Sequence, residues 1–146
     1  MTMVLYDQAK KDGVDDYFRL NISGMSFMLD QMESVNAVNL EARHERFPDF
    51  IDADDESLEM IAYNTKLNRV LSAVDDLENG VPAYKFYSND GWIVTPDECL
   101  FLADKLMNRY TQLQYGVDED LLTAPLVLRF VNYCRAAAKY GGFRVY

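Results

Sequence analysis

Apolar residues recur every three to four positions in four stretches of the chain, and this period predicts four amphipathic helices. Each stretch ends close to glycine or asparagine, residues that are common where helices stop. The expected helices cover about residues 24–37, about 54–78, about 96–115, and from 124 or 125 to the glycine pair at 141 and 142. Much of the chain is therefore expected to be helical.

The first of these helices carries a stripe of methionines. Met25, Met28 and Met32 are three and four residues apart, so they share one helix face. Ser23 precedes them at the position expected of an N-cap. Flexible thioether side chains suit either a partner groove or an irregular interior, and core packing is the favoured interpretation.

The second helix is expected to begin at an N-cap of Asp54 or Asp55 and to end before Gly80, which suits a left-handed C-cap. Its apolar positions predict one buried face. They are Leu58, Ile61, Ala62, Val70, Leu71, Val74 and Leu77.

A β-hairpin is predicted between the second and third helices. Tyr84–Tyr87 and Trp92–Val94 are rich in aromatic and β-branched residues, and they flank Asn89-Asp90-Gly91, which accepts the positive φ angles of a tight turn. Thr95 and Glu98 then have the spacing of a capping box that starts the third helix.

The last residues of the chain, Phe143–Tyr146, alternate like a strand, and we expect them to pair with one strand of the hairpin. The sequence therefore predicts a single α+β domain over residues 1–146. About four helices would pack on a small antiparallel sheet, formed by the hairpin 84–94 and the C-terminal strand 143–146.

Negative charge is concentrated in the first part of the chain. The formal net charge is −10. Residues 1–80 hold 17 acidic side chains against 7 lysines and arginines, whereas residues 81–146 hold 7 of each. Such a field repels the phosphates of nucleic acids and anionic membranes and attracts cations. We therefore expect a basic protein as partner, and neither nucleic acid nor membrane.

The acidic residues expected to contact that partner lie between positions 49 and 59, where no lysine or arginine occurs. One tryptophan of the hairpin is added because aromatic side chains can form a binding platform. The predicted partner-binding residues are Asp49, Asp52, Asp54, Asp55, Glu56, Glu59 and Trp92. Solubility and the dipole at a helix N-terminus are alternative reasons for these acids.

Residue types that carry catalysis are scarce. His44 is the single histidine, so a site with two histidines from one chain is excluded. Cys99 and Cys134 lie within apolar helical stripes, which favours core packing over reactivity. The acidic run from Asp52 lacks the glycine and glutamate of a calcium loop. We predict no catalytic residue, no metal site and no cofactor.

The cellular location is predicted from sequence features that we do not find. The sequence has neither an apolar run of about 18 residues nor a basic and then apolar N-terminus, so we expect no membrane span and no secretory signal. With only two cysteines, a disulfide framework is not expected either. A cytoplasmic location is the prediction.

Several short motifs resemble those of small uncharacterised bacterial proteins found in mobile or prophage-like contexts. They are Tyr17-Phe18-Arg19, Asn89-Asp90-Gly91, the helical segment Leu102–Leu106 and the late Gly141-Gly142-Phe143. The resemblance implies a cytoplasmic bacterial accessory protein. It implies no known activity and supplies no catalytic residues.

Two main functional hypotheses follow. The first is a non-catalytic acidic interaction protein, of the immunity or defence-inhibitor type, that binds a basic protein. The alternative is a small enzyme that uses carboxylates, with or without a divalent cation, in a pocket formed by the acidic connection, His44 and the hairpin. The oligomeric state is left open, with dimerisation through an exposed sheet edge as a third alternative, because an unpaired edge is a template for pairing.

Overall fold

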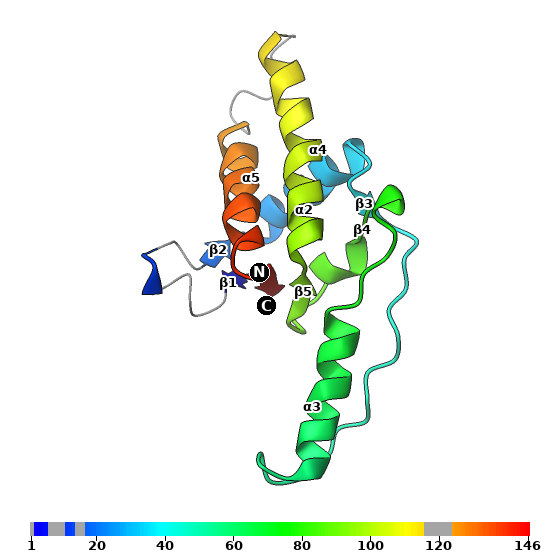
Figure 1. Ribbon diagram of the computed structural model, residues 1–146. Helices are drawn as coiled ribbons and strands as arrows, with labels where there is room; N and C mark the ends of the chain where they lie inside the picture. The colour runs from blue at the N-terminus through cyan, green and yellow to red at the C-terminus, as the bar shows by residue number, and fades with distance from the viewer. Residues whose placement is uncertain (1, 6–10, 14–16, 116–123) are drawn as a thin grey trace.

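The computed structural model describes residues 2–5, 11–13, 17–115 and 124–146 (Figure 1). Helices and a small antiparallel sheet confirm the predicted α+β class. The long helices are α2 (Ile22–Ser34), α3 (Leu58–Leu71), α4 (Pro96–Tyr115) and α5 (Ala124–Ala138). None of the described helices is long and apolar enough to cross a membrane.

The sheet brings the two ends of the chain together. Its strands in spatial order are β2 (Tyr17–Arg19), β1 (Thr2–Leu5), β6 (Phe143–Val145) and β5 (Trp92–Val94). All three pairings in this sheet are antiparallel: Met3 lies opposite Phe18 and Val145, and Ile93 lies opposite Arg144. The predicted C-terminal strand is confirmed, and its partner within the expected hairpin region is Trp92–Val94.

The core lies between this sheet and the helices. α4 and α5 pack side by side, and α2 contacts α4 (Figure 1). Met28 and Met32 of α2 are completely buried, and Met25 is nearly so, which confirms core packing of the methionine stripe. The other fully buried large apolar side chains include Leu102, Leu106, Phe130 and Phe143.

The N-cap predicted for α2 is wrong by two residues. The Asn21 side chain accepts a hydrogen bond from the Gly24 N–H at 2.7 Å, whereas the Ser23 hydroxyl donates to Asn21 Oδ1 at 3.1 Å. The helix therefore begins at Ile22. Asparagine and serine cap equally well, so the local sequence could not decide between them.

The predicted hairpin over residues 84–94 is also wrong. Ala83–Phe86 forms a short 3-10 helix, η2, and only Trp92–Val94 is a strand. Of Asn89, Asp90 and Gly91, only Gly91 has a positive φ, of 86°, and its N–H donates to the Val145 carbonyl at 2.9 Å. β5 consequently pairs with β6 instead of with its neighbour in sequence.

The second helix is shorter and far more exposed than expected. α3 is capped by Ser57, whose side chain accepts from the Met60 N–H at 3.1 Å, and not by Asp54 or Asp55. Of its 14 residues only Met60, Val70 and Leu71 are buried. The predicted apolar face fails at Leu58, which is 84% exposed, and beyond the helix at Val74, which is 62% exposed.

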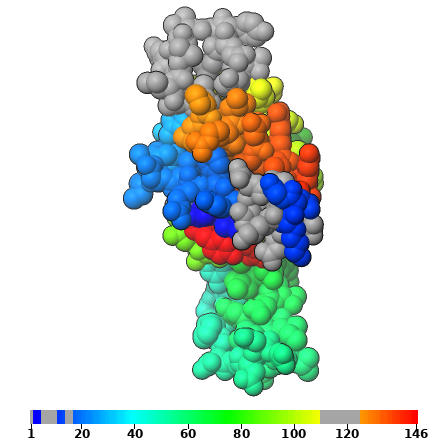
Figure 2. Space-filling view, turned by 90° about the vertical axis from the view of Figure 1, so that its left-hand side faces the viewer, coloured from blue at the N-terminus to red at the C-terminus, as the bar shows by residue number. Residues whose placement is uncertain are grey.

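The reason is that α3 leaves the body of the protein. Together with the extended segment before it, α3 forms a projection that we name the arm (residues 40–71), and Figure 2 shows it protruding in cyan and green. At its base, β3 (Val38–Asn39) and β4 (Val81–Pro82) form a parallel pair, and η1 (Leu77–Asn79) precedes β4. Gly80, between η1 and β4, has a positive φ of 92°, but its ψ of 167° is extended and it ends η1. The left-handed C-cap predicted there for the second helix is therefore wrong, because α3 ends at Leu71.

Candidate functional site

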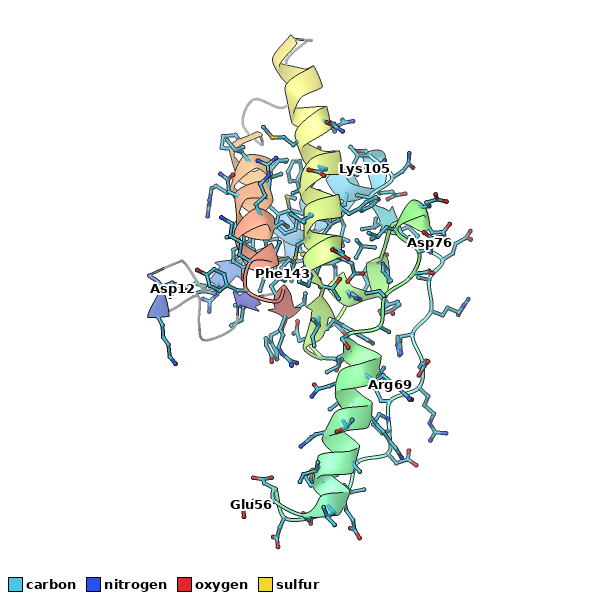
Figure 3. All side chains as sticks on the ribbon, in the orientation of Figure 1. Asp12, Glu56, Arg69, Asp76, Lys105 and Phe143 are labelled. Carbon is cyan, nitrogen blue, oxygen red and sulfur yellow. The ribbon has the colours of Figure 1, made fainter. Side chains whose placement is uncertain are left out.

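The arm carries all six acidic residues of the predicted partner-binding set. They lie along the extended segment and the first turn of α3, and Figure 3 shows Glu56 at the far end of the arm, with Arg69 closer to the body. We name residues 49–61 the tip. All six acids are exposed. The fold therefore concentrates negative charge on an element that projects from the body of the protein.

Among the described residues, ion pairs compensate Glu45 and Asp49 but not the acids from Asp52 to Glu56. Arg46 Nη2 lies 3.0 Å from Asp49, and Arg69 Nη2 lies 3.9 Å from Glu45. Within the described part of the chain, no cation pairs with the run from Asp52 to Glu56. Exposed pairs of this kind add little stability, so their main consequence is electrostatic. The negative charge that no described ion pair neutralises therefore lies in the tip, on the run from Asp52 to Glu56.

A groove of about 610 Å³ runs between the extended segment and α3. It combines both signs of charge with one aromatic ring, Tyr63, whose edge meets Phe50 with ring centroids 6.2 Å apart. Its charged lining residues are Glu45, Arg46, Asp49, Glu59, Lys66 and Arg69. Because the signs are mixed, the groove favours polar contacts without a strong preference for charge.

A cluster of four rings holds the base of the arm on the body. His44 and Phe47 come from the arm, and Tyr84 and Trp92 from the segment around η2 and β5. The His44 ring centroid lies 5.0 Å from that of Trp92 and 5.3 Å from that of Tyr84, and Phe47 lies 5.3 Å from Trp92. Rings at these distances and tilts attract one another beyond the area they bury. The cluster therefore fixes the direction of the arm.

Trp92 belongs to this base and not to the exposed tip. Its side chain is 1% exposed, and its indole Nε1 donates to Ser88 Oγ at 2.9 Å. Of the seven predicted partner-binding residues it is therefore the one with no exposed face. Its burial follows from its position on β5, where all three residues are buried.

His44 is exposed, and its neighbours are aromatic rather than acidic. Its Nδ1 donates to the Glu45 carbonyl oxygen at 2.7 Å, since a carbonyl oxygen can only accept. Among the described residues, no group of three or more His, Cys, Asp or Glu side chains could hold a metal ion. The groove between the extended segment and α3 has Glu45 but not His44 among its lining residues.

A buried ion pair, which no pattern in the sequence predicted, joins η2 to the start of α4. Lys85 Nζ lies 2.6 Å from Glu98 Oε1 and also donates to the Ile93 carbonyl at 2.8 Å. Both side chains are at most 1% exposed. The same Glu98 oxygen accepts from the Thr95 N–H at 3.0 Å, which confirms the predicted capping box. One carboxylate therefore caps α4 and neutralises a buried lysine.

Burial lowers the pKa of Lys85, while the charge of Glu98 and its hydrogen bond act in the opposite direction. Burial also raises the pKa of the Tyr84 hydroxyl, with a smaller contribution from Glu98. The second Glu98 oxygen is buried and has no hydrogen-bond partner in the described structure. Because no surface opens onto the pair, it holds segments together rather than meeting a substrate.

Cys99 and Cys134 confirm the expectation of core packing. Both thiols are free and fully buried, Cys99 on α4 and Cys134 on α5. Burial raises the pKa of each thiol, and the charge of Glu98 adds to the effect at Cys99. The reactive thiolate form is therefore disfavoured twice, by its desolvation and by lack of access.

We expect neither cysteine of the folded protein to react with Ellman's reagent at about pH 8, because the reagent attacks accessible thiolates. Unfolding in urea should expose both and release two equivalents of chromophore per chain. Absorbance at equilibrium before and after urea addition measures this. Rapid reaction of one full equivalent without denaturant would contradict the buried placement.

Comparisons with known proteins return no relative: no family model, no curated protein and no solved structure matches this chain. The resemblance to small bacterial proteins therefore stays a prediction. Function has to be argued from the arm itself, since no known site can be transferred to it.

Proposed function

We propose that this protein is a non-catalytic acidic interaction protein that presents the tip of its arm to a basic protein partner, as an immunity protein or an inhibitor of a defence system does. One observation carries the proposal. The run from Asp52 to Glu56 projects from the body with no compensating cation among the described residues.

The placement of these charges favours binding over mere solubility. Charges needed only for solubility can be spread over a surface with both signs interspersed. Here the charge is collected on a protruding element whose direction is fixed by the ring cluster at its base. A projecting field of one sign accelerates encounter with an oppositely charged partner and selects against anionic ones.

The helix dipole does not account for the whole cluster. Acids stabilise a helix when they lie in its first turn, and in α3 only Glu59 does so. Asp52, Asp54 and Asp55 precede the Ser57 cap. Their charge is therefore available to a partner.

The carboxylate-enzyme alternative has no comparable support. It needs acidic side chains that converge with His44, whereas Glu45, Asp49 and Glu59 line a groove that does not have His44 among its lining residues. No specific observation favours it, so the interaction protein is the conclusion.

The proposal predicts that charge reversal at the tip abolishes partner capture. The variant replaces Asp52, Asp54, Asp55 and Glu56 by lysine. Wild-type protein on beads is exposed to a lysate of the cells that encode it, eluted with salt, and the bound proteins are identified by mass spectrometry. We expect one or a few basic proteins, and at least about a ten-fold lower yield with the variant, since reversed charges repel the partner.

A matched control separates the tip from net charge. It reverses four exposed acids on the body, Asp30, Glu33, Asp97 and Asp104, and so changes the total charge equally. This control should retain the partner, and circular dichroism should show all three proteins folded. Equal capture by the wild type and the tip variant, or equal loss in both variants, would refute a role for the tip.

A further inference from the structure

An apolar stripe on the outer face of α3 lies among the acids of the tip. Leu58 is 84% exposed and Ile61 is 51% exposed, and Ala62 beside them is exposed as well. Residues three and four apart share a helix face, so Leu58 and Ile61 form a strip, and Ala62 borders it while also lining the groove.

The arm does not need this strip for its own packing. α3 is held by its opposite face, where Met60, Val70 and Leu71 are buried. Phe50, on the neighbouring extended segment, is 78% exposed as well. Single exposed apolar residues are ordinary, but a group of large ones on a projecting element is typical of an interaction surface.

The acidic side chains around the strip restrict the kind of molecule that can bind there. Asp54, Asp55 and Glu56 lie two to four residues before Leu58, and Glu59 follows it. An occupant must therefore supply apolar side chains to the strip and cations around them. A second copy of the arm would bring like charges together, which opposes association.

We propose that the outer face of α3 at the tip binds a basic amphipathic helix of a partner protein. This inference rests on the proposed function and names the form of the partner's binding segment. Leu58 and Ile61 form a ridge along a helix, and a second helix with apolar residues at three- and four-residue spacing can pack against such a ridge. Lysines or arginines beside that apolar face meet the acids of the tip.

The test uses two labelled synthetic peptides of about 18 residues, long enough for a helix to form. Both contain the same leucines and lysines, but only one arranges them on opposite helix faces. Fluorescence anisotropy with the full chain measures their affinities. Burial of the leucine face against Leu58 and Ile61 should make the amphipathic peptide bind at least about ten-fold more tightly than its scrambled form.

The substitutions Leu58→Ser and Ile61→Ser, made together, should remove this preference without changing any charge. Both side chains are exposed, so the variant is expected to keep the fold, which its melting temperature checks. Ile22→Ser is the matched control, because Ile22 is 91% exposed on α2, away from the arm. It should leave the preference intact.

The outcomes separate this inference from the proposed function. If both peptides bind equally, or if the double serine variant keeps the preference, the helix proposal is overturned while charge-driven binding stands. If the bound peptide gains strand rather than helix signal in circular dichroism, the helix proposal fails too. If reversal of the tip acids leaves binding of both peptides unchanged, the proposed function itself fails.

Discussion

Replacing Gly142 by alanine is expected to destabilise the protein by more than about 4 kcal/mol, an unusually large effect for one methyl group. Gly142 lies between α5 and β6, with a φ of 91°, and its N–H donates to the Ala137 carbonyl at 2.8 Å. A Cβ at this position would collide with the Val94 carbonyl oxygen of β5. Backbone atoms of a paired strand cannot move aside cheaply, so α5 and the sheet would have to separate.

Gly13→Ala isolates the clash from the conformational cost. Gly13 also has a positive φ, of 74°, but no described atom lies within 4 Å of the place that an alanine methyl group would take. The free energy of unfolding of the Gly13→Ala variant should fall by only the roughly 1–2 kcal/mol that a left-handed conformation costs an L-residue. Urea unfolding of both variants measures the difference. Similar losses in the two would show that close approach to Val94 is not what requires glycine at 142.

Replacing Glu98 by glutamine is expected to lower the free energy of unfolding at neutral pH by about 3–5 kcal/mol, the usual cost of leaving one member of a buried ion pair without its partner. Glutamine keeps an oxygen that can accept from the Thr95 N–H, so the cap of α4 survives. What is lost is the negative charge 2.6 Å from Lys85 Nζ. Urea titrations of wild type and variant give the value.

The double variant Lys85→Met/Glu98→Gln is the control, because it removes the buried cation as well. It should recover most of the loss, since well-packed uncharged residues often replace buried pairs without cost. A double variant as unstable as Glu98→Gln would mean that packing or capping, and not charge, carries the effect.

The pH dependence gives a second, independent measurement of the same effect. Burial lowers the pKa of Lys85 below its ordinary value of 10.5, and loss of Glu98 removes the charge that opposes this change. Between the folded and unfolded pKa values the unfolded state binds more protons, so stability rises with pH. Glu98→Gln should therefore be less destabilised at about pH 9.5 than at about pH 7, whereas the double variant should show no such recovery.

The features predicted well from the sequence were those set by neighbours along the chain. The capping box at Thr95 and Glu98 formed as expected, and so did α4, α5 and the buried methionine stripe of α2. In each case a three- to four-residue period or a three-residue cap decides the outcome locally, and the tertiary structure reinforces it. The strand β6 also formed where alternation predicted it.

The failures came from contacts far apart in the sequence. Tyr84–Tyr87 has a strand-forming composition. Lys85, however, points inward and donates to Glu98 and to the Ile93 carbonyl, and the backbone forms a 3-10 helix at this position. The strand β2 was not predicted either, because its three residues form a strand by pairing with β1, which is distant along the chain. In α3 the period was present, yet it could not tell which of two apolar faces would meet the core.

The candidate site shows the same division. The sequence by itself determined the acidic character of residues 49–59, since charge needs no folding. Only the tertiary structure decided that this charge projects on an arm, that Trp92 is buried at its base, and that Leu58 and Ile61 stay in solvent. Local patterns determine helices and caps because those depend on near neighbours. The direction of an element, and therefore which face it leaves exposed, depends on packing between distant residues.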